Sequence, residues 1–182
     1  MTFYNISEPF YSNFEYLENI EWQMSRAEKY CLIHLLQTIK PEYSLEIGTY
    51  KGGSLQVLSK FSKKVYSIDI DSNRKNQLSS LFKNVIFKTG KSHKLIKSVL
   101  HEIENKKGKL NFILIDGDHS KEGVKKDLEQ ILSFDFKHPL IIILHDSFNP
   151  QCREGMKAID YKKYKFIEHI DLDFIHGCFS PN

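Results

Sequence analysis

The sequence predicts an α/β protein built on a doubly wound, mostly parallel sheet, and its hydrophobic pattern is the main reason. Short runs rich in β-branched residues alternate with stretches whose apolar residues recur at helical spacing. Strands that are each followed by a helix form a parallel sheet, because the helix returns the chain through a right-handed crossover. The expected strands are residues 43–47, 64–69, 84–88, 110–115 and 139–145, and the expected helices are residues 25–40, 53–62, 73–82, 92–104 and 119–133.

Individual elements follow from local signals. The first helix is expected to end before Pro41, which cannot continue it. The runs 111–115 and 140–144 are almost entirely apolar, as expected of strands covered on both faces, so we place both in the middle of the sheet. Residues 164–170 and 172–179 read as two strands joined by a short connection, which predicts a C-terminal antiparallel hairpin.

Length and aromatic content suggest how the chain is organised. At 182 residues, one domain with a single sizeable core is expected, and we assign it to residues 25–182. Residues 1–24 are rich in aromatic side chains that follow no clean period. We expect them to form an irregular cover or a short helix over the domain, or part of a homodimer interface.

Charge and cysteine content exclude several classes of protein. The 26 Lys and Arg residues exceed the 23 Asp and Glu residues by three and are scattered, so nucleic acid is not indicated as a partner. The longest apolar run, residues 140–144, is too short to cross a bilayer, and the N-terminus lacks signal-peptide features. Cys31, Cys152 and Cys178 form no Cys-x-x-Cys pair, which argues against disulfides and structural zinc. A soluble cytoplasmic protein is expected.

A glycine-rich turn, Glu46-Ile-Gly-Thr-Tyr-Lys-Gly-Gly-Ser54, joins the first expected strand to its helix. Open α/β sheets bind nucleotides at such turns. Asp69 follows Gly48 by 21 residues and ends the second strand, a spacing typical of a carboxylate that binds ribose hydroxyls. The turn therefore predicts a nucleoside site. The alternative is a plain tight turn with a solvated acid on the next strand.

The glycine spacing indicates which kind of nucleoside fits. A dinucleotide fingerprint has its second glycine two residues after the first, but that position is Tyr50, whose side chain would obstruct a diphosphate. A phosphate-binding P-loop is also excluded, because Gly53 is followed by Ser54 instead of lysine. The turn is better suited to a nucleoside without phosphates.

Two further motifs follow the fourth and fifth strands: Asp116-Gly-Asp-His119 and His145-Asp-Ser147. The carboxyl ends of parallel strands open onto one crevice, so these residues are expected near the glycine turn. Asp116, His145 and Asp146 could hold one divalent cation there. Carboxylates favour magnesium, calcium or manganese, and the imidazole leaves manganese, iron or zinc open.

The motif after the fourth strand also has a purely structural interpretation. Asp118 or Ser120 could cap the helix that starts near Lys121, and for Asp118 we rank capping above a metal role. His119 at a helix start could be a surface imidazole. Asp116 and Asp146 are harder to explain in this way, because carboxylates beside a buried core are costly unless they are paired.

With these motifs in view, residues 25–179 resemble the class I S-adenosylmethionine-dependent methyltransferases. The segment Glu46–Ser54 is close to the form found in catechol O-methyltransferase-like enzymes. Asp116–His119 with Glu122-Gly-Val124, and His145–Ser147, are similar to the branch of macrocin-type sugar O-methyltransferases and cephalosporin hydroxylase-like proteins. The resemblance implies a seven-stranded Rossmann-like sheet whose final hairpin inserts an antiparallel strand.

The resemblance also implies S-adenosylmethionine as cofactor and assigns roles to residues. Asp116, His145 and Asp146 fall at magnesium-ligand positions, although relatives usually carry a carboxylate where this chain has His145. Magnesium is expected first and manganese second. Asp116 and His119 are the expected catalytic residues, His119 as the base. The expected cofactor contacts are Glu46, Gly48 and Ser54 at the methionine part, Asp69 at the ribose, Gly90, Lys91 and Ser92 at the adenine, together with Tyr50, Gly52 and Asp116.

The expected function is metal-assisted O-methylation of a small hydroxylated acceptor, for example a sugar. One alternative omits the metal and leaves His119 as the sole base, with oxygen or nitrogen as the acceptor atom. Another is a cofactor-binding, non-catalytic partner subunit, and hydroxylation follows only from family analogy. Acceptor specificity is expected from residues 1–24, the loop 147–155 and residues 176–178.

Overall fold

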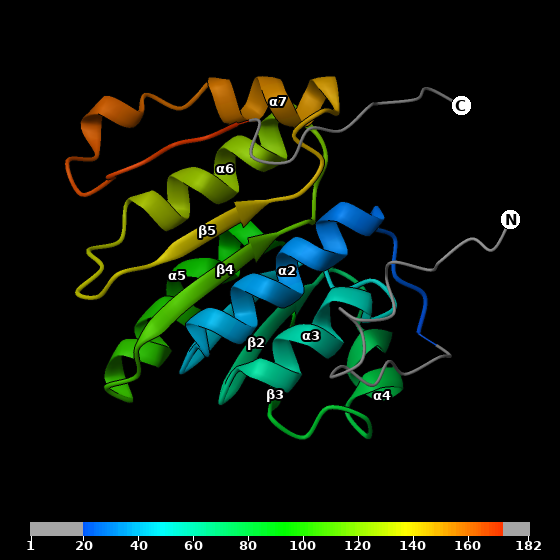
Figure 1. Ribbon diagram of the computed structural model, residues 1–182. Helices are drawn as coiled ribbons and strands as arrows, with labels where there is room; N and C mark the ends of the chain where they lie inside the picture. The colour runs from blue at the N-terminus through cyan, green and yellow to red at the C-terminus, as the bar shows by residue number, and fades with distance from the viewer. Residues whose placement is uncertain (1–19, 173–182) are drawn as a thin grey trace, which may run out of the picture.

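The computed structural model describes residues 20–172, which form a parallel five-stranded sheet with helices on both faces (Figure 1). The order β3-β2-β1-β4-β5 reverses direction between β1 and β4, the topological switch point of the sheet. This architecture confirms the α/β, Rossmann-like class, but the expected seven strands are wrong for the described residues, whose sheet has five strands, all parallel. The strands are β1 (Tyr43–Ile47), β2 (Lys64–Asp69), β3 (Val85–Thr89), β4 (Leu110–Ile115) and β5 (Ile141–Leu144).

The helices divide between the two faces of the sheet. In Figure 1, α2 and α3 cross one face, while α5 lies behind the other and α6 and α7 pack together beside β5. The helices are α2 (Arg26–Ile39), α3 (Gly53–Phe61), α4 (Asn73–Leu78), α5 (Ser92–Asn105), α6 (Lys121–Leu132) and α7 (Pro150–Lys157), followed by a short 3₁₀ turn, η1 (Tyr161–Lys163). Within residues 20–172, no helix has the length and apolar character needed to span a membrane.

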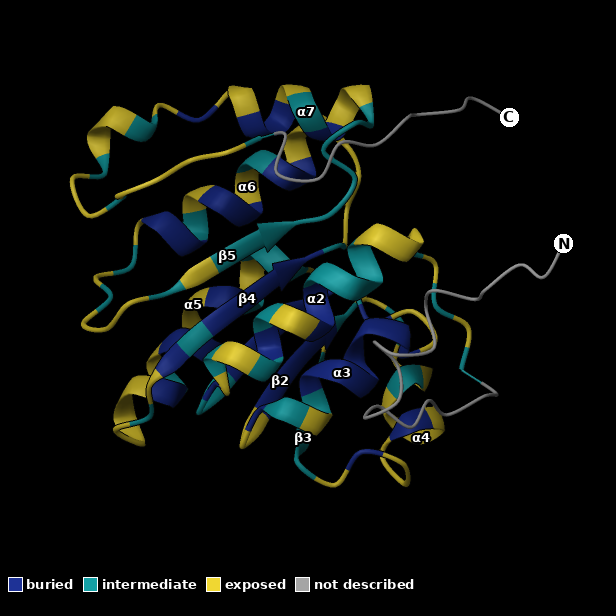
Figure 2. Ribbon diagram, viewed as in Figure 1, coloured by how far each residue is buried: buried dark blue, intermediate teal, exposed yellow. Residues whose placement is uncertain are grey.

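Burial along β4 explains why the sheet is covered on both sides. Phe112 and Leu114 enter the core formed with α2 and α3, while Ile113 and Ile115 enter the core formed with α5, α6 and α7. Successive strand residues point to opposite faces, so a continuous apolar run requires two covered faces. Figure 2 shows β4 as mainly buried ribbon between the helical layers.

The central position expected for residues 140–144 is wrong for the described sheet. β5 pairs with β4 on one side only and ends the strand order, and Ile141 is 38% exposed. Its apolar run is nevertheless explained, because Ile142 and Leu144 pack against one core and Ile143 against the other. An apolar run therefore reports covered faces and not a second neighbouring strand.

The strand expected at residues 164–170 is also wrong. This segment forms a turn, closed by a hydrogen bond from the Ile167 amide to the Tyr164 carbonyl at 3.1 Å. Tyr164 and Ile167 pack on the core, and Phe166 contacts the rings of Tyr164 and Phe136. The apolar residues are thus used for side-chain packing without a strand ladder. The second expected strand, beyond residue 172, and residues 1–19 of the expected cover lie outside the described residues.

Most of the loop expected at residues 147–155 is helix α7. Asn149 caps this helix, accepting a hydrogen bond from the Gln151 amide at 3.0 Å, and Pro150 occupies the first helical turn. Both residues are favourable at these positions. The helix lies against α6 (Figure 1).

Candidate active site

The loops that follow all five strands surround a cavity of about 1000 Å³ at the carboxyl edge of the sheet. The strand ladder continues one residue into four of these loops, through hydrogen bonds from the amides of Gly48, Gly90, Asp116 and His145 to the neighbouring strands. The start of each loop is therefore fixed by main-chain bonds. The predicted residues that line the cavity are Gly48, Tyr50, Ser54, Asp69, Gly90, Lys91, Ser92, Asp116, His119, His145 and Asp146.

Gly48 is the tightest point of the cavity wall. Its φ is +88°, and a Cβ at this position would lie 2.0 Å from the Asp116 carbonyl oxygen. Any side chain would require the β1 and β4 loops to separate, so only glycine fits. The close approach brings the glycine turn directly beside Asp116.

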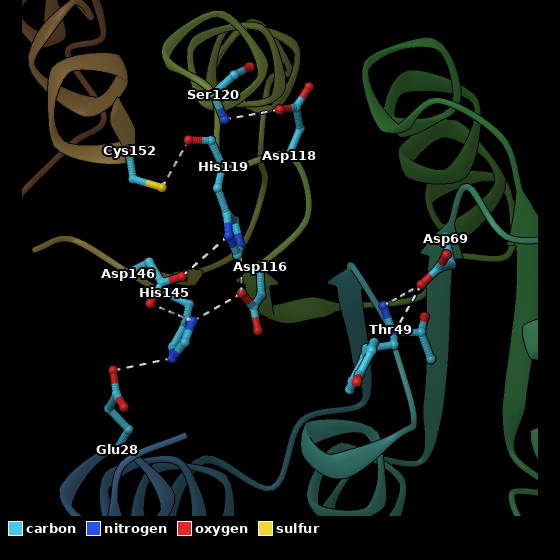
Figure 3. Close-up of polar contacts among 11 residues, drawn as sticks. Glu28, Thr49, Asp69, Asp116, Asp118, His119, Ser120, His145, Asp146 and Cys152 are labelled. Carbon is cyan, nitrogen blue, oxygen red and sulfur yellow. Dashed lines mark hydrogen bonds and ion pairs between the residues drawn. The ribbon is translucent and has the colours of Figure 1, made fainter. Parts of the chain in front are cut away.

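Asp69 has a role that the sequence did not reveal. Its Oδ2 accepts a hydrogen bond from the amide of Thr49 at 2.9 Å (Figure 3) and one from the amide of Tyr50 at 3.0 Å. Its Oδ1 accepts one from the amide of Asp71 at 2.8 Å. Tyr50 has a φ of +47°, so the carboxylate stabilises a turn that includes a left-handed non-glycine residue. A carboxylate offers about four lone-pair positions, which leaves about one for a ligand in the cavity.

Two of the predicted cofactor contacts, Glu46 and Gly52, are not among the described residues that line the cavity. The Glu46 side chain is fully buried and accepts hydrogen bonds from the hydroxyls of Ser54 at 2.6 Å and Ser67 at 3.1 Å. Burial raises its pKa to about 8, although the two serine bonds act in the opposite direction. The expected contact between Glu46 and the cofactor stays a prediction. The residue supports the turn from within the core.

Five ionisable side chains form what we call the carboxylate–imidazole cluster: Glu28, Asp116, His119, His145 and Asp146 (Figure 3). Asp116 Oδ1 lies 3.1 Å from His119 Nε2 and 3.0 Å from His145 Nδ1. Asp146 contacts both imidazoles as well, at 3.4 and 3.3 Å. The strand order brings the loops after β4 and β5 together, and the contact between His145 and Glu28 joins them to the first turn of α2.

The surrounding carboxylates raise the pKa of both imidazoles. The hydrogen bond to Asp116 raises the pKa of His119, whose side chain remains 45% exposed. Burial opposes ionisation of Asp116, but the bonds to His119 and His145 outweigh it and lower the Asp116 pKa. Asp146 adopts a left-handed backbone with φ of +56°, a conformation that aspartate tolerates better than most residues.

His145 was predicted as a metal ligand, but both of its nitrogens face carboxylates. Nδ1 faces Asp116 and Asp146, and Nε2 lies 3.2 Å from Glu28 Oε1, an ion pair without straight hydrogen-bond geometry. Burial alone would lower the His145 pKa, but these carboxylates raise it to about 12. The contact with His145 in turn lowers the Glu28 pKa to about 2. His145 therefore behaves as a buried cation between acids.

Glu28 was missed at the sequence level, although a signal was present. Ser25 and Glu28 form a capping box at the start of α2: the Ser25 hydroxyl accepts from the Glu28 amide, and Glu28 Oε2 accepts from the Ser25 amide at 2.7 Å. Such a box marks a helix start. The second carboxylate oxygen then remains free to face His145 across the sheet edge.

Among the described residues, one group has ligand atoms spaced closely enough that it could hold a metal ion: Asp116, His119 and Asp146 each offer one such atom, all within 4.8 Å of one another. Two of these residues, Asp116 and Asp146, are predicted ligands, whereas the third is His119 where the sequence predicted His145. The structural interpretation of the preceding loop is confirmed, since Asp118 accepts from the Ser120 amide and Ser120 caps α6, which begins at Lys121. Asp118 is thus occupied with forming the turn.

Residues just before α2 close one side of the cavity. Glu21 forms an ion pair with Lys51 and accepts a hydrogen bond from the Tyr50 hydroxyl at 3.3 Å. Trp22 packs so closely on α3 that a Cβ on Gly53 would come within 2.5 Å of it. This segment is anchored to the glycine turn and borders the same cavity.

The fold resembles solved methyltransferase structures. The O-methyltransferase of Bacillus cereus in complex with SAH is 23% identical, with a TM-score of 0.57 over 74% of this chain and 67% of that one. The SAH-bound methyltransferase PaMTH1 of Podospora anserina is 20% identical, with a TM-score of 0.57 over 69% of this chain and 55% of that one. The chain thus spans about half to two thirds of these proteins, and at such identities the likeness concerns the fold.

A third structure, the MycE methyltransferase of the mycinamycin biosynthetic pathway in complex with Mg and SAH, is 17% identical with a TM-score of 0.50, over 79% of this chain and 36% of that one. A comparison with curated proteins gives no match. The sequence profile of a family described as a methyltransferase domain matches residues 45–147, more than half of the chain. Because this match runs from β1 to the loop after β5 and so includes every strand end around the cavity, the chain belongs to that methyltransferase domain family.

Proposed function

We propose that the protein transfers the methyl group of S-adenosylmethionine to a hydroxyl group of a small acceptor, with the help of a divalent cation. The main support is the position of the carboxylate–imidazole cluster. Asp116 belongs to this cluster, and its carbonyl group also lies against Gly48 of the glycine turn. A site for an acceptor hydroxyl and a site for a nucleoside therefore share one wall of the same cavity.

The residues present suit S-adenosylmethionine. The cavity volume of about 1000 Å³ is at the upper end for small-molecule sites, which leaves room for a cofactor and a small acceptor together. Asp69 keeps lone-pair capacity for a ribose hydroxyl. Tyr50 lines the cavity where a dinucleotide would require glycine. Gly90, Lys91 and Ser92, at the far end of the cavity, are the proposed border of the adenine.

The donor set also suits a hard divalent cation. Two carboxylates with ligand atoms within 4.8 Å of each other match the ligand preferences of magnesium or manganese. Asp116 and Asp146 would hold the ion, and the neighbouring His119 would remain available to take the acceptor proton. Bound there, the ion would supply positive charge that lowers the pKa of an acceptor hydroxyl. His145 would then remain the internal cation that keeps Asp116 and Asp146 in place.

His119 is the proposed proton acceptor. Methyl transfer from a sulfonium is an in-line displacement, so the protein must align the acceptor oxygen and remove its proton. The His119 side chain is partly exposed to the cavity and its ring lies between Asp116 and Asp146. These carboxylates stabilise the imidazolium formed when His119 takes the proton, and their contacts fix the ring orientation.

The same contacts favour a second candidate, a methyltransferase without a metal. Asp116 and Asp146 alone would then orient and charge-stabilise His119, and turnover would survive a strong chelator. The two candidates differ in whether Asp116 and Asp146 bind a cation or only the imidazole.

Binding measurements test this proposal without a known acceptor. We would titrate S-adenosylhomocysteine into the protein by calorimetry and follow Mn²⁺ binding by electron paramagnetic resonance. We expect Asp146→Ala to abolish Mn²⁺ binding at this site and to change the affinity for the nucleoside little. Asp135→Ala is the matched control, because Asp135 is exposed and lies outside the cavity. Absence of S-adenosylhomocysteine binding would overturn the methyltransferase proposal, and unchanged Mn²⁺ binding in Asp146→Ala would overturn the metal site.

A further inference from the structure

Asp127 occupies an unusual position on α6. It is 1% exposed and belongs to the buried face of the helix, together with Val124, Leu128 and Ile131. Burial raises its pKa to about 6, and no cation offsets that cost among the groups that influence it. An apolar residue would be the stabilising choice at this point of the helix. A buried carboxylate therefore calls for an explanation beyond packing.

The contact made by Asp127 reaches the cavity. Its two carboxylate oxygens lie 2.7 and 2.9 Å from the hydroxyl oxygen of Ser92, the first residue of α5. Ser92 is partly buried and lines the cavity beside Gly90 and Lys91. Asp127 itself does not line the cavity. Any influence of Asp127 on a ligand would therefore pass through the serine hydroxyl.

The direction of this hydrogen bond is set by chemistry. An ionised carboxylate can only accept, so the single hydroxyl proton of Ser92 points to Asp127. The remaining lone pairs of the serine oxygen can then only accept a hydrogen bond from a ligand. Without Asp127, the hydroxyl could rotate and act as donor or acceptor.

We propose that Asp127 is a positioning residue that holds the Ser92 hydroxyl as a hydrogen-bond acceptor, so that the cavity selects a base with an amino group over one with a keto group. This inference rests on the proposed function, which puts the adenine beside Ser92. The exocyclic amine of adenine donates to such an oxygen. The keto oxygen of hypoxanthine, at the same position, would face it as a second acceptor.

The test compares two ligands that differ at this one group, S-adenosylhomocysteine and S-inosylhomocysteine, by calorimetric titration above pH 7. The unchanged protein is expected to prefer the adenosyl compound by about tenfold or more, the effect of turning a hydrogen bond into two opposed acceptors. Asp127→Leu and Ser92→Ala should each reduce this preference to about twofold or less. In the double variant the two losses of preference should not add, because both substitutions remove the same hydrogen bond between Ser92 and Asp127.

The ratio of the two affinities separates positioning from a structural role, which would weaken both ligands equally and leave the preference intact. Ser98→Ala is the matched control, since Ser98 is an exposed serine of the same helix whose hydroxyl bonds to the Leu95 carbonyl. If Asp127→Leu keeps the preference, or if the unchanged protein binds both compounds equally, the inference is wrong. Should Asp127→Leu fail to fold, Ser92→Ala still decides. Failure of the unchanged protein to bind either ligand would instead overturn the proposed function.

Discussion

Replacing Glu46 by glutamine should change how the stability of the protein depends on pH. Glu46 is fully buried between Ser54 and Ser67, and its pKa in the folded state is about 8. In an unfolded chain the pKa of a glutamate is about 4.3. Between these values the folded state binds the proton more tightly, so this group favours folding at low pH, and that contribution is lost as the pH rises from about 4.3 to about 8.

The magnitude follows from the two pKa values. One pH unit inside this window costs about 1.4 kcal/mol, so the contribution of Glu46 to the free energy of unfolding falls by about 3–4 kcal/mol between pH 5 and pH 8. Glutamine has nearly the same shape, can serve both serine hydroxyls and does not titrate. The stability of Glu46→Gln relative to the unchanged protein should therefore rise by that amount over the same range.

Urea unfolding at pH 5, 6, 7 and 8 would measure this difference for both proteins. Subtracting one curve from the other cancels every other titrating group that the substitution leaves alone. A difference that stays constant from pH 5 to pH 8 would refute the reasoning, because it would mean that Glu46 ionises equally easily in the folded and unfolded chains.

Three further substitutions test other parts of the site. Gly48→Ala should destabilise the protein by about 3 kcal/mol or more, through its positive φ and the Asp116 contact, and an unfolding midpoint near that of the unchanged protein would contradict the geometry. Ser120→Ala should cost about 1 kcal/mol in urea unfolding through loss of the α6 cap, and no loss would speak against that cap. Glu28→Gln should lower the pKa of His145 from about 12, as followed by imidazole NMR shifts, whereas an unchanged titration would show that the ion pair is unimportant.

The sequence was sufficient for elements with a strong local pattern. β1, β2 and β4 match their expected bounds, because covered parallel strands are short apolar runs bounded by turn residues. The order of strands was not readable, since β5 is as apolar as β4 but ends the described sheet. Helix α7 was missed despite Asn149-Pro150, a recognisable helix start, because its residues are mainly polar.

The topology predicted that the site residues would lie close together, but it did not predict which side chains contact one another. Asp116, His119, His145 and Asp146 meet because parallel strands end at one edge. Which imidazole faces which carboxylate depends on side-chain geometry and on Glu28, which comes from a distant part of the sequence. Likewise, the spacing of Asp69 suggested a ribose contact, but the backbone amides that occupy most of its oxygens appear only in three dimensions.

The contact between Gly48 and the Asp116 carbonyl has a consequence for how such a site can change over time. The contact links the glycine turn to the loop that carries Asp116 through main chain alone, so the spacing of these two loops does not depend on a side chain that substitution could alter. Other walls of the cavity, by contrast, include side chains of residues 21–24, in the segment before α2. Under the proposed function, new acceptors could therefore be acquired by replacing residues in those walls, while the glycine turn and Asp116 keep a constant spacing.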